Sequence, residues 1–547
     1  MPRQRQMPTR APALFLLVGM VLGLCLASTQ PAPVAFSLTF ALFLAGFSYY
    51  FAKRGSSLWL LSFITATSLT AWAYGTLRLP MTPSSDFLKL PAREAFLQFE
   101  VERILQERNQ YGRLSGIANV IDANTTSRLQ PGAKIFFRVD LEEAGTVHLL
   151  RGSVIQATGV LSPIPLKLEP DSFEAYLKDI GIHYRFERTS EHQLLRPPGS
   201  FDQFCQRMNL HFQHYLRLGA PENHELDSIY IAMLLGRKAE LNNDQKDRFR
   251  MTGTMHFFAI SGLHIGVIAT VIAQFLILVR VPRKISPFIG LPLLYLYVEI
   301  TGAAPSAVRA FLMAVFFWAS YAFTRQRTPL SALAASAVFV LILKPDQIWS
   351  IGFQLSYTVV LSILLFGLPV YEMLTQRLAP FKYLPKANWT RLQRLYAGAI
   401  DAVILLFAIS FSAWLASSLL SATFFGYFSP AAILLNMLLV NLAALAISTG
   451  VISLALAIIG LETATEFINH AAWLSIYLMD QLVVASTRIP GMIIHSDTFP
   501  NYIAYLGLSS YFISLFWLNH ARHKRASYAW LLPILLIILS LFLGMGT

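Results

Sequence analysis

The side chains best placed for chemistry stand in one short stretch, residues 252–266, which reads TGTMHFFAISGLHIG. Its polar members are His256, Ser261 and His264. At 100° per residue these three would lie within an arc of about 140° on a single helix. The surrounding sequence is apolar, and polar side chains in a membrane helix normally face the bundle interior or a water-filled cavity. The three residues therefore predict a hydrophilic path. Histidines that only hydrogen-bond neighbouring helices are the alternative interpretation.

Three glycines accompany these side chains. Gly253 lies just before His256, and Gly262 and Gly266 are four residues apart. Small residues at that spacing predict a helix face on which another helix approaches closely.

A second group, residues 299–309, predicts an outer hairpin between two membrane spans. Gly302 lies within this hairpin, and Arg309 falls about one turn into the helix that follows. A cation at that place is suited to guiding phosphate groups toward a pore. Alternatively, Glu299 neutralises Arg309 in an ion pair, because an unpaired charge inside a membrane is costly.

Uncharged polar residues form a third, more scattered group. The stretch 352–356 reads GFQLS and contributes Gly352, Gln354 and Ser356. Further along the chain come Ser417, Ser418, Ser421, Ser429 and Asn436. Repeated hydroxyl and amide groups of this kind suit either an aqueous path or hydrogen bonds between helices.

The composition identifies the setting of these residues. Of 547 residues, 55% are hydrophobic and 13% are charged, whereas soluble proteins carry about 25% charged residues. Apolar runs of about 18 or more residues recur along the chain, as in membrane-spanning helices. Two cysteines, Cys25 and Cys205, provide no disulfide framework and no metal-ligand spacing. A soluble enzyme, a disordered protein and a disulfide-rich secreted domain are excluded, and the sequence predicts a polytopic α-helical membrane protein.

About thirteen spans are expected. After a first, uncleaved helix near the N-terminus, the apolar segments are 33–52, 57–77, 256–279, 286–302, 306–324, 329–343, 349–369, 397–420, 430–447, 449–461, 502–519 and 527–545. The segment 470–488 carries Asp480 and is expected to lie at the membrane interface as an amphipathic helix.

The net charge of +13 comes mainly from short basic clusters beside apolar segments. Lys and Arg are retained on the cytoplasmic side of a membrane. We therefore expect a cytoplasmic side that holds Arg3, Arg5, Arg10 and the clusters at 280–284, 325–327, 377–394 and 520–525. The N-terminus is then cytoplasmic, and residues 80–250 are extracytoplasmic. Attraction of nucleic acid is permitted by the same charges but not required by them.

The predicted outer segment differs from the rest of the chain. Short runs rich in β-branched and aromatic residues occur at 96–105, 111–121, 133–140, 153–161 and 182–189. Five such runs separated by turn residues predict a small β-barrel that is OB-like. Its near-neutral charge argues against a strong phosphate-binding surface. Arg103, Arg108 and Arg113 form either a basic strip for DNA or, as the interleaved Glu102 and Glu107 favour, an ordinary solvated face.

These features divide the chain into five regions. Residues 1–79 hold three N-terminal transmembrane helices, 80–200 the extracytoplasmic OB-like domain, and 201–250 amphipathic or linker helices. Residues 251–461 form the transmembrane core, and 462–547 hold the interfacial helix and the C-terminal transmembrane helices.

The stretch 256–266, HFFAISGLHIG, resembles the signature of the ComEC competence family, whose members carry DNA across the cytoplasmic membrane. Other stretches match that family in the same order. They are Leu-Leu-Gly at 234–236, Gly302 with Ser306, Arg309 and Ala310, GFQLS at 352–356, and Phe428-Ser429 followed by Asn436. In the outer domain the matching residues are Phe173, Tyr176, Leu177, Gly181 and Ile182. The likeness covers roughly residues 90–445.

The resemblance implies a channel of the bacterial inner membrane that admits one DNA strand. The residues expected to line or shape its path are His256, Ser261, His264, Arg309, Gln354, Ser356 and Asn436. Structural roles are expected for Gly253, Gly262, Gly266, Gly302 and Gly352. None of these residues needs to be a nucleophile, since transport requires only donors that replace water around phosphates and release them again. No cofactor and no metal ion are expected.

The chain also departs from the family pattern. Many members carry a metallo-β-lactamase-like domain with a His-x-His-x-Asp-His motif after the membrane core. Here the sequence ends in an apolar helix, and His520 and His523 do not form that motif. We therefore expect that this chain is not an enzyme and that a separate protein supplies the nuclease. Arg237-Lys238 and Asn441 replace residues common in the family, which bears on local geometry.

The expected partners follow from the resemblance and from energetics. They are single-stranded DNA, membrane lipid and an extracytoplasmic DNA receptor. An inside-negative potential opposes an entering polyanion by about 2.3 kcal/mol per charge per 100 mV, and the sequence has no nucleotide-binding P-loop. A cytosolic ATPase, helicase or strand-binding protein is therefore also expected. An oligomer is compatible with the sequence.

Two other functions stay open at this point. An intramembrane hydrolase would use Ser261 as nucleophile with His264 or His256 as base. An ion-coupled transporter of a small solute would use Glu299, Asp401 and the histidines as carriers, although no inverted repeat supports it.

Overall fold

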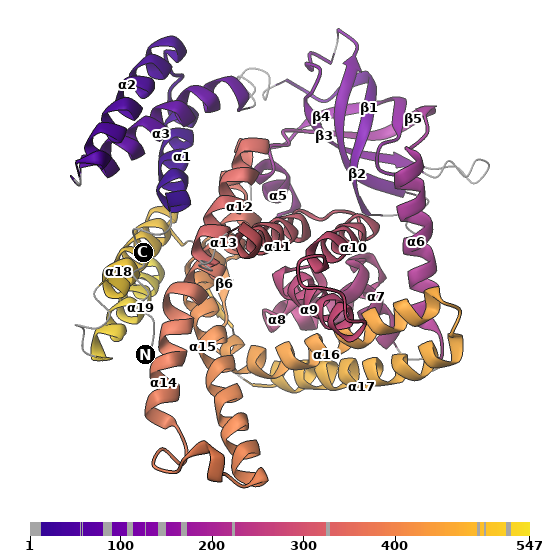
Figure 1. The fold of residues 1–547 in the computed structure, drawn as a ribbon. Coiled ribbons are helices and arrows are strands. Elements are labelled where there is room, and N and C mark those ends of the chain that lie inside the picture. Colours follow the sequence, from indigo (N-terminus) through magenta and orange to yellow (C-terminus); the bar gives the residue numbers. More distant parts are fainter. Residues whose placement is uncertain are drawn as a thin grey trace.

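The computed structural model describes residues 12–54, 56, 58–79, 90–106, 113–125, 127–140, 149–165, 172–220, 225–323, 329–489, 493–496, 499–520 and 527–546. Some of the predictions concern residues that lie outside this described part of the chain. They are Arg3, Arg5, Arg10, Glu107, Arg108, the cluster 325–327 and the cluster at 520–525 beyond His520. Figure 1 shows the arrangement of the elements.

Three N-terminal helices form a separate layer at the upper left of Figure 1: α1 (Pro12–Thr29), α2 (Val34–Lys53) and α3 (Leu58–Arg78). Helix α1 approaches α3 at glycines. A Cβ atom on Gly23 would overlap the carbonyl oxygen of Ser68. The hydroxyl of Tyr74 on α3 donates a hydrogen bond to the carbonyl of Ile342. Met20, Leu24 and Ala71 of this layer also pack with core residues between 333 and 357 in one buried cluster, so the layer is joined to the helical core by apolar packing as well. The predicted segments 33–52 and 57–77 match α2 and α3 closely.

The five predicted β runs form a closed barrel. Its strands are β1 (Arg93–Gln106), β2 (Arg113–Ala123), β3 (Lys134–Asp140), β4 (Val154–Pro163) and β5 (Tyr184–Arg196), with the short helix α5 (Phe173–Asp179) before the last strand. The order around the barrel is β1-β2-β3-β5-β4; β3 and β5 are parallel, and the other pairs are antiparallel. This architecture fits the OB-like prediction loosely. The extracytoplasmic placement stays a prediction.

Alternating side chains fill the barrel, as the period of two along a strand requires. Phe99, Phe137 and Phe186 are fully buried at its centre. The ring of Phe99 lies 5.2 Å from that of Phe137 and 5.9 Å from that of Phe186, measured between centroids. These rings come from three different strands and close the barrel with a solid interior.

Three helices follow the barrel in the sequence: α6 (Ser200–Arg217), α7 (Leu226–Leu235) and α8 (Asn243–Met251). Helix α6 is amphipathic and runs down beside the core in Figure 1. Helix α7 is different, because every residue from Ile229 to Leu235 is buried. It forms the centre of the largest hydrophobic cluster rather than a connecting segment.

The core continues with α9 (Gly262–Leu278), α10 (Ser286–Ile300), α11 (Pro305–Phe323), α12 (Pro329–Leu343) and α13 (Ile351–Ser362). A π-helical turn, Ile363–Gly367, joins α13 directly to α14 (Leu368–Leu378). The amide of Asn519 donates a 2.8 Å hydrogen bond to the carbonyl of Leu365 in this turn. A π turn disturbs the regular helical pairing, and Asn519 supplies the partner that this carbonyl needs.

The last helices are α15 (Arg391–Phe425), α16 (Ala432–Ile458), α17 (Glu462–Thr487), α18 (Asn501–His520) and α19 (Leu531–Met545). The prediction of two spans at 430–447 and 449–461 is wrong, because α16 passes through both without a break. The hydroxyls of Ser448 and Thr449 bond back to the carbonyls of Ala444 and Leu445, so the polar residues there do not interrupt the helix.

Helix α17 contains the segment predicted to lie at the membrane interface. It packs along α16, and the pair runs across the direction of α14 and α15 in Figure 1. Asn469 of α17 accepts a 2.6 Å hydrogen bond from Ser453 and donates one of 2.9 Å to the carbonyl of Tyr215. One face of α17 is therefore fixed inside the protein, whereas its relation to the membrane stays a prediction.

Five helical segments of the described chain are long and apolar enough to cross a membrane, judged by length and composition. They are Val34–Lys53, Ile351–Leu378, Arg391–Phe425, Ala432–Ile458 and Tyr528–Met545. Six shorter apolar helices of 10–17 residues accompany them. These five agree with a membrane protein, and the count of about thirteen spans stays a prediction.

Candidate functional site: a polar cluster in the helical core

The signature stretch is not one continuous helix. A short 3-10 helix, Met255–Phe258, is followed by extended backbone at Ser261, and α9 begins at Gly262. The prediction that His256, Ser261 and His264 share one helical face is therefore wrong. Serine is a preferred residue at the position before a helix, where its side chain replaces missing backbone partners. The start of α9 at this point follows from that preference.

Ser261 and His264 form the cap of α9. The backbone N–H of Ser261 donates to Nδ1 of His264 over 3.3 Å, and the Ser261 hydroxyl lies 3.0 Å from the same nitrogen. The His264 side chain is fully buried. Serine and a polar residue three positions later are the arrangement of a capping box. This contact orients the loop before α9 and leaves His264 no access to solvent.

His256 lies outside this contact. It is exposed, and its Nδ1 is 3.1 Å from the carbonyl oxygen of Gly253. The ring packs against Phe257 at 4.4 Å between centroids. The structure thus separates the two histidines by role, since His264 fixes a helix start and His256 remains at a surface.

Two of the five predicted structural glycines do not make the close contact expected of them. A Cβ atom on Gly262 or Gly266 would meet no atom of the described residues within 4 Å. The prediction that they form a close helix–helix contact is therefore wrong. Gly253 and Gly302 instead adopt φ angles of +70° and +86°, which favour glycine because a side chain is strained there.

Several motif residues from distant parts of the chain meet at the loop before α9. A Cβ atom on Gly236 would lie 3.2 Å from Ile260, and one on Gly253 would lie 3.7 Å from Ser429. The hydroxyl of Ser306 at the start of α11 donates a 2.7 Å hydrogen bond to the carbonyl of Ile260. The loop is therefore held by α7, α11 and the segment between α15 and α16.

A second cluster lies one turn further along α11. Arg309 is three residues after Ser306 and is only 4% exposed. Its Nη2 donates a 3.2 Å hydrogen bond to the hydroxyl of Ser356 on α13. A Cβ atom on Gly352 would lie 2.9 Å from the same nitrogen. Arg309 thus occupies the space that glycine leaves on α13.

The guanidinium of Arg309 has few partners for a buried cation. Its Nε makes no hydrogen bond with the described residues, and no carboxylate among them forms an ion pair with it. Tyr357, which follows Ser356, is also buried and interacts electrostatically with Arg309. Sequence reasoning missed Tyr357, whose only signal was its place one residue after the GFQLS stretch.

Glu299 does not neutralise Arg309, and that alternative is wrong. Its carboxylate pairs with Arg151 of the barrel at 2.7 Å, and the glutamate side chain is 10% exposed. The two residues are 148 positions apart, so no local pattern indicated the contact. Glu299 therefore connects the barrel to the end of α10 and leaves Arg309 without its expected partner.

Two predicted path residues lie outside both clusters. Gln354 donates to the carbonyl of Ile348 over 3.1 Å and accepts from the hydroxyl of Tyr505 over 3.1 Å. Asn436 is half-buried on α16, and its Oδ1 is buried without a partner among the described residues. The structure therefore forms two contacts among the predicted path residues. Arg309 meets Ser356 beside Gly352, and Ser261 meets His264. Among the described residues, neither contact includes a hydrogen bond to Gln354 or Asn436.

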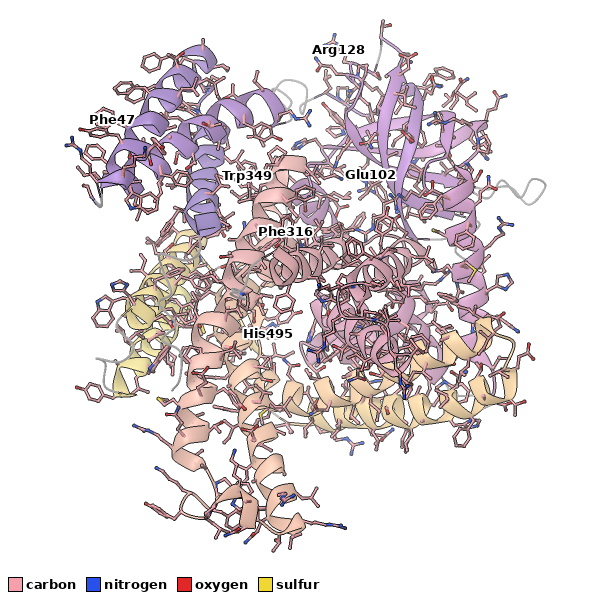
Figure 2. All side chains as sticks on the ribbon, viewed as in Figure 1. Phe47, Glu102, Arg128, Phe316, Trp349 and His495 are labelled. Atoms are coloured by element: carbon pink, nitrogen blue, oxygen red, sulfur yellow. The ribbon has the colours of Figure 1, made fainter. Side chains whose placement is uncertain are left out.

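A charged cavity lies where the barrel meets the core. It has a volume of about 310 Å³ and is lined by Arg78, Glu102, Asn119, Lys134, Leu343, Lys344, Pro345 and Asp346. Glu102, labelled in Figure 2, lies 3.1 Å from Nζ of Lys344 and 3.5 Å from Nζ of Lys134. Burial raises the pKa of Glu102 and the two lysines lower it, with a net result below its ordinary value. One carboxylate thus connects the barrel to the residue that follows α12.

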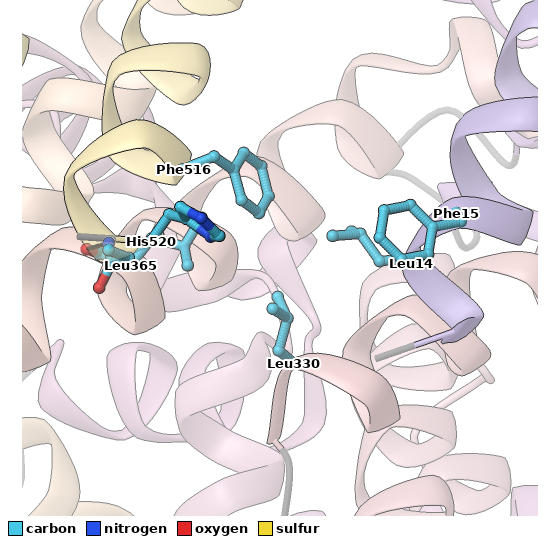
Figure 3. Close-up of a pocket in the computed structure, with 7 residues that line it drawn as sticks. Leu14, Phe15, Leu330, Leu365, Phe516 and His520 are labelled. Atoms are coloured by element: carbon cyan, nitrogen blue, oxygen red, sulfur yellow. Dashed lines mark hydrogen bonds between the residues drawn. The ribbon is translucent and has the colours of Figure 1, made fainter. Parts of the chain in front are cut away.

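An apolar cavity of about 280 Å³ lies between α1, α12, the π turn and α18. Figure 3 shows Leu14, Phe15, Leu330 and Phe516 around it, with His520 at one side. None of the predicted path residues lines either cavity. Arg309 and His264, one from each polar cluster, are both buried. No group of three or more metal-ligating side chains occurs in the described part of the chain.

Comparisons with known proteins agree with the motif pattern. The family model described as "Competence protein" matches residues 233–522, just over half of the chain. A relative named "ComE operon protein 3", from Bacillus subtilis strain 168, is 26% identical over 226 residues. That match covers 41% of this chain and only 29% of the relative. None of the solved structures matches the chain significantly. The family match includes the loop before α9, Arg309 and the GFQLS stretch, and the chain belongs to the competence protein family.

Proposed function

We propose that this chain is a bacterial inner-membrane channel that passes single-stranded DNA inward during natural transformation. The observation that carries the proposal is the burial of Arg309 with no carboxylate partner among the described residues. Membership of the competence family and the likeness to a competence operon protein agree with a role in DNA uptake.

A buried cation is costly unless it is paired, because low-dielectric surroundings do not replace its lost hydration. Charges inside a membrane protein commonly mark a pathway for substrate or ions. Among the described residues, the guanidinium of Arg309 has one hydrogen-bond partner, the Ser356 hydroxyl. Arginine offers five donors in a fork that matches phosphate oxygens. A phosphodiester passing between α11 and α13 is suited to supply the missing acceptors.

The passage requires reversible contacts. Hydroxyl and amide groups bind phosphate more weakly than a charged pair does, so that the strand is released at each step. Ser356 and Ser261 provide such hydroxyls, and Gln354 and Asn436 provide amides on other helices. In this proposal the present conformation is the closed one, and α11 and α13 separate to admit the strand.

The proposal includes a fixed orientation and further proteins. The N-terminus lies in the cytoplasm and residues 80–250 lie outside, where a DNA receptor delivers the substrate. A separate protein supplies the nuclease. The membrane potential opposes entry of each phosphate by about 2.3 kcal/mol per 100 mV, so a cytosolic ATPase, helicase or strand-binding protein draws the strand inward.

Uptake of labelled DNA tests the proposal. In a transformable host that lacks its own copy of the gene, complementation with Arg309→Met is expected to give normal membrane levels and surface DNA binding but little internal DNA. Arg283→Met, at an exposed arginine before α10, is the matched control and is expected to support uptake. Normal uptake by the Arg309→Met variant would exclude the guanidinium from the path.

The geometry bears on the two other functions. Ser261 and His264 lie within hydrogen-bond reach, which a hydrolase needs, yet the contact caps α9 and the imidazole is fully buried. For an ion-coupled transporter, the two expected carboxylate carriers already have partners. Glu299 pairs with Arg151, and the carboxylate of Asp401 accepts hydrogen bonds from Tyr371 and Thr375. The Nε2 atom of His264 has no hydrogen-bond partner among the described residues, and its burial beside the cap of α9 gives it no path to water.

A further inference from the structure

The connection between α14 and α15 carries a concentrated positive charge. Residues 373–400 contain no aspartate or glutamate. Their five cations, all exposed, are Arg377, Lys382, Lys386, Arg391 and Arg394. No described carboxylate forms an ion pair with any of the five. This segment, the α14–α15 tip, projects beyond the rest of the chain at the bottom of Figure 1.

The tip has a defined structure of its own. The ring of Phe381 packs at 5.8 Å from Trp389 and at 6.1 Å from Tyr396. Nε1 of Trp389 donates a 3.0 Å hydrogen bond to the carbonyl of Leu384, and the ammonium of Lys386 lies 5.9 Å above the Trp389 ring. The segment is therefore a folded surface that presents its cations in fixed positions.

An apolar strip continues from the tip along α15. Leu392 is 77% exposed and Leu395 is 72% exposed. Tyr396, Val403 and Phe407 are exposed further along the same helix. The strip therefore begins beside Arg391 and Arg394 and runs into the segment that is apolar enough to cross a membrane.

Helix α15 is longer than the hydrocarbon core of a bilayer is thick. Its 35 residues extend about 50 Å at 1.5 Å per residue, whereas the hydrocarbon core of a bilayer is about 30 Å thick. Part of the helix therefore lies outside the hydrocarbon, and the end that carries Arg391 and Arg394 is the one suited to the headgroup region. Exposed leucines beside exposed cations are the composition of a surface that lies in the membrane interface.

We propose that the α14–α15 tip is a docking surface for anionic phospholipid headgroups, with its cations on the phosphates and its leucines among the upper acyl chains. This does not depend on the proposed passage of DNA. A nucleic-acid strand is the less suited occupant, because strand binding uses cations and aromatic rings and leaves the exposed leucine strip without a partner.

A fluorescence experiment on the full chain tests the proposal. Cys25 and Cys205 are replaced by serine, Tyr383→Cys is introduced at a position that is 96% exposed, and a small dye is attached there. The labelled protein is placed in nanodiscs of phosphatidylcholine that carry a headgroup quencher, with or without phosphatidylglycerol. The expected result is stronger quenching as phosphatidylglycerol is added. Salt at about 1 M, which shortens the screening length to about 3 Å, is expected to abolish the difference.

Two double variants distinguish an effect of the cations at the tip from an effect of the net charge of the protein. Arg391→Gln with Arg394→Gln is expected to lower the apparent affinity for phosphatidylglycerol roughly fivefold for each cation removed, because each is worth about 1 kcal/mol near an anionic surface. Arg113→Gln with Lys178→Gln, on the barrel, removes the same charge and is expected to leave the quenching unchanged.

Three results would overturn the proposal. They are equal quenching with and without phosphatidylglycerol, insensitivity to the tip substitutions, and a dye response to single-stranded oligonucleotide alone. The last would identify the tip as a strand-receiving surface instead. Because none of these readouts involves DNA uptake, their failure is distinguishable from failure of the channel proposal.

Discussion

Gly352 and Arg309 lie so close that a Cβ atom on the glycine would be 2.9 Å from Nη2 of the arginine. The contact joins α13 to α11 at the level of the hydrogen bond between Arg309 and Ser356. The glycine therefore provides the volume in which a buried guanidinium is held. The two residues form one unit, and a change in either is expected to affect the other.

Replacement of Gly352 by alanine tests that unit. The added methyl group meets the far end of a flexible side chain, so the guanidinium shifts and its bond to Ser356 is lost, while the helices move little. We expect an unfolding free energy within about 1 kcal/mol of the parent protein and DNA uptake reduced about tenfold, as for the loss of about 1.4 kcal/mol of phosphate binding. Unfolding in detergent and uptake of labelled DNA measure the two effects.

Gly398→Ala on α15 is the matched control for this change. A Cβ atom there meets nothing within 4 Å, and alanine in a helix is more stable than glycine by about 0.5–1 kcal/mol. Unchanged uptake and equal or higher stability are expected. Full uptake by Gly352→Ala as well would mean that the position of the guanidinium is unimportant.

Arg309→Met is expected to separate stability from function. A buried charge without a carboxylate partner destabilises the fold, and an apolar side chain of similar volume removes that cost. Thermal unfolding is therefore expected to show equal or higher stability, while uptake is lost. If Arg309 has only a structural role, the Arg309→Met protein is expected to be less stable, and its DNA uptake is expected to fall only in proportion to the amount of protein in the membrane.

Substitutions at Ser261 distinguish a helix cap from a nucleophile. Asparagine is as good a residue before a helix as serine, whereas alanine costs about 1 kcal/mol. Ser261→Asn is expected to retain stability and most uptake, and Ser261→Ala is expected to lower both moderately. If both variants lose activity completely, the hydroxyl acts as more than a cap and the hydrolase interpretation regains support.

The contact between Glu102 and Lys344 predicts a pH dependence. The pKa of Glu102 is lowered in the folded protein, against burial, by Lys134 and Lys344. A carboxylate with a lowered pKa contributes stability above its ordinary value of about 4.3, and that stability is lost as the pH falls through the folded-state pKa. The partner lysine is half exposed, so the contribution is modest.

A double-mutant cycle with Glu102→Gln and Lys344→Met measures this contribution. A coupling of a few tenths to about 1 kcal/mol is expected at neutral pH, and none is expected once Glu102 is protonated. Coupling that is unchanged in acid would show that the charge of Glu102 does not hold the barrel to the core.

Segments with a distinct composition could be predicted from the sequence. The five runs rich in β-branched and aromatic residues each matched a strand of the barrel. Helix ends were less accurate, because hydropathy marks only the apolar middle of a helix. The span 397–420 proved to be part of α15, which begins at Arg391 after a cap formed by Thr390 and Gln393.

The sequence indicated which residues belong to the site but not which of them contact one another. Arg309, Gly352 and Ser356 were all named, yet their junction depends on how α11 packs against α13. Glu299 was paired with its nearest cation in the sequence, whereas its actual partner, Arg151, lies in the barrel. The break at Ser261 did have a local signal, since a serine followed three residues later by a polar side chain is typical of a helix start.

The central claim is that a DNA strand passes between α11 and α13 beside Arg309. The most direct measurement is cross-linking of incoming DNA that carries 4-thiothymidine, illuminated during uptake, with the attached peptides identified by mass spectrometry. The account predicts adducts on peptides from α11 and α13 that disappear in the Arg309→Met protein. Adducts confined to the barrel and outer loops, in cells that take up DNA normally, would contradict it.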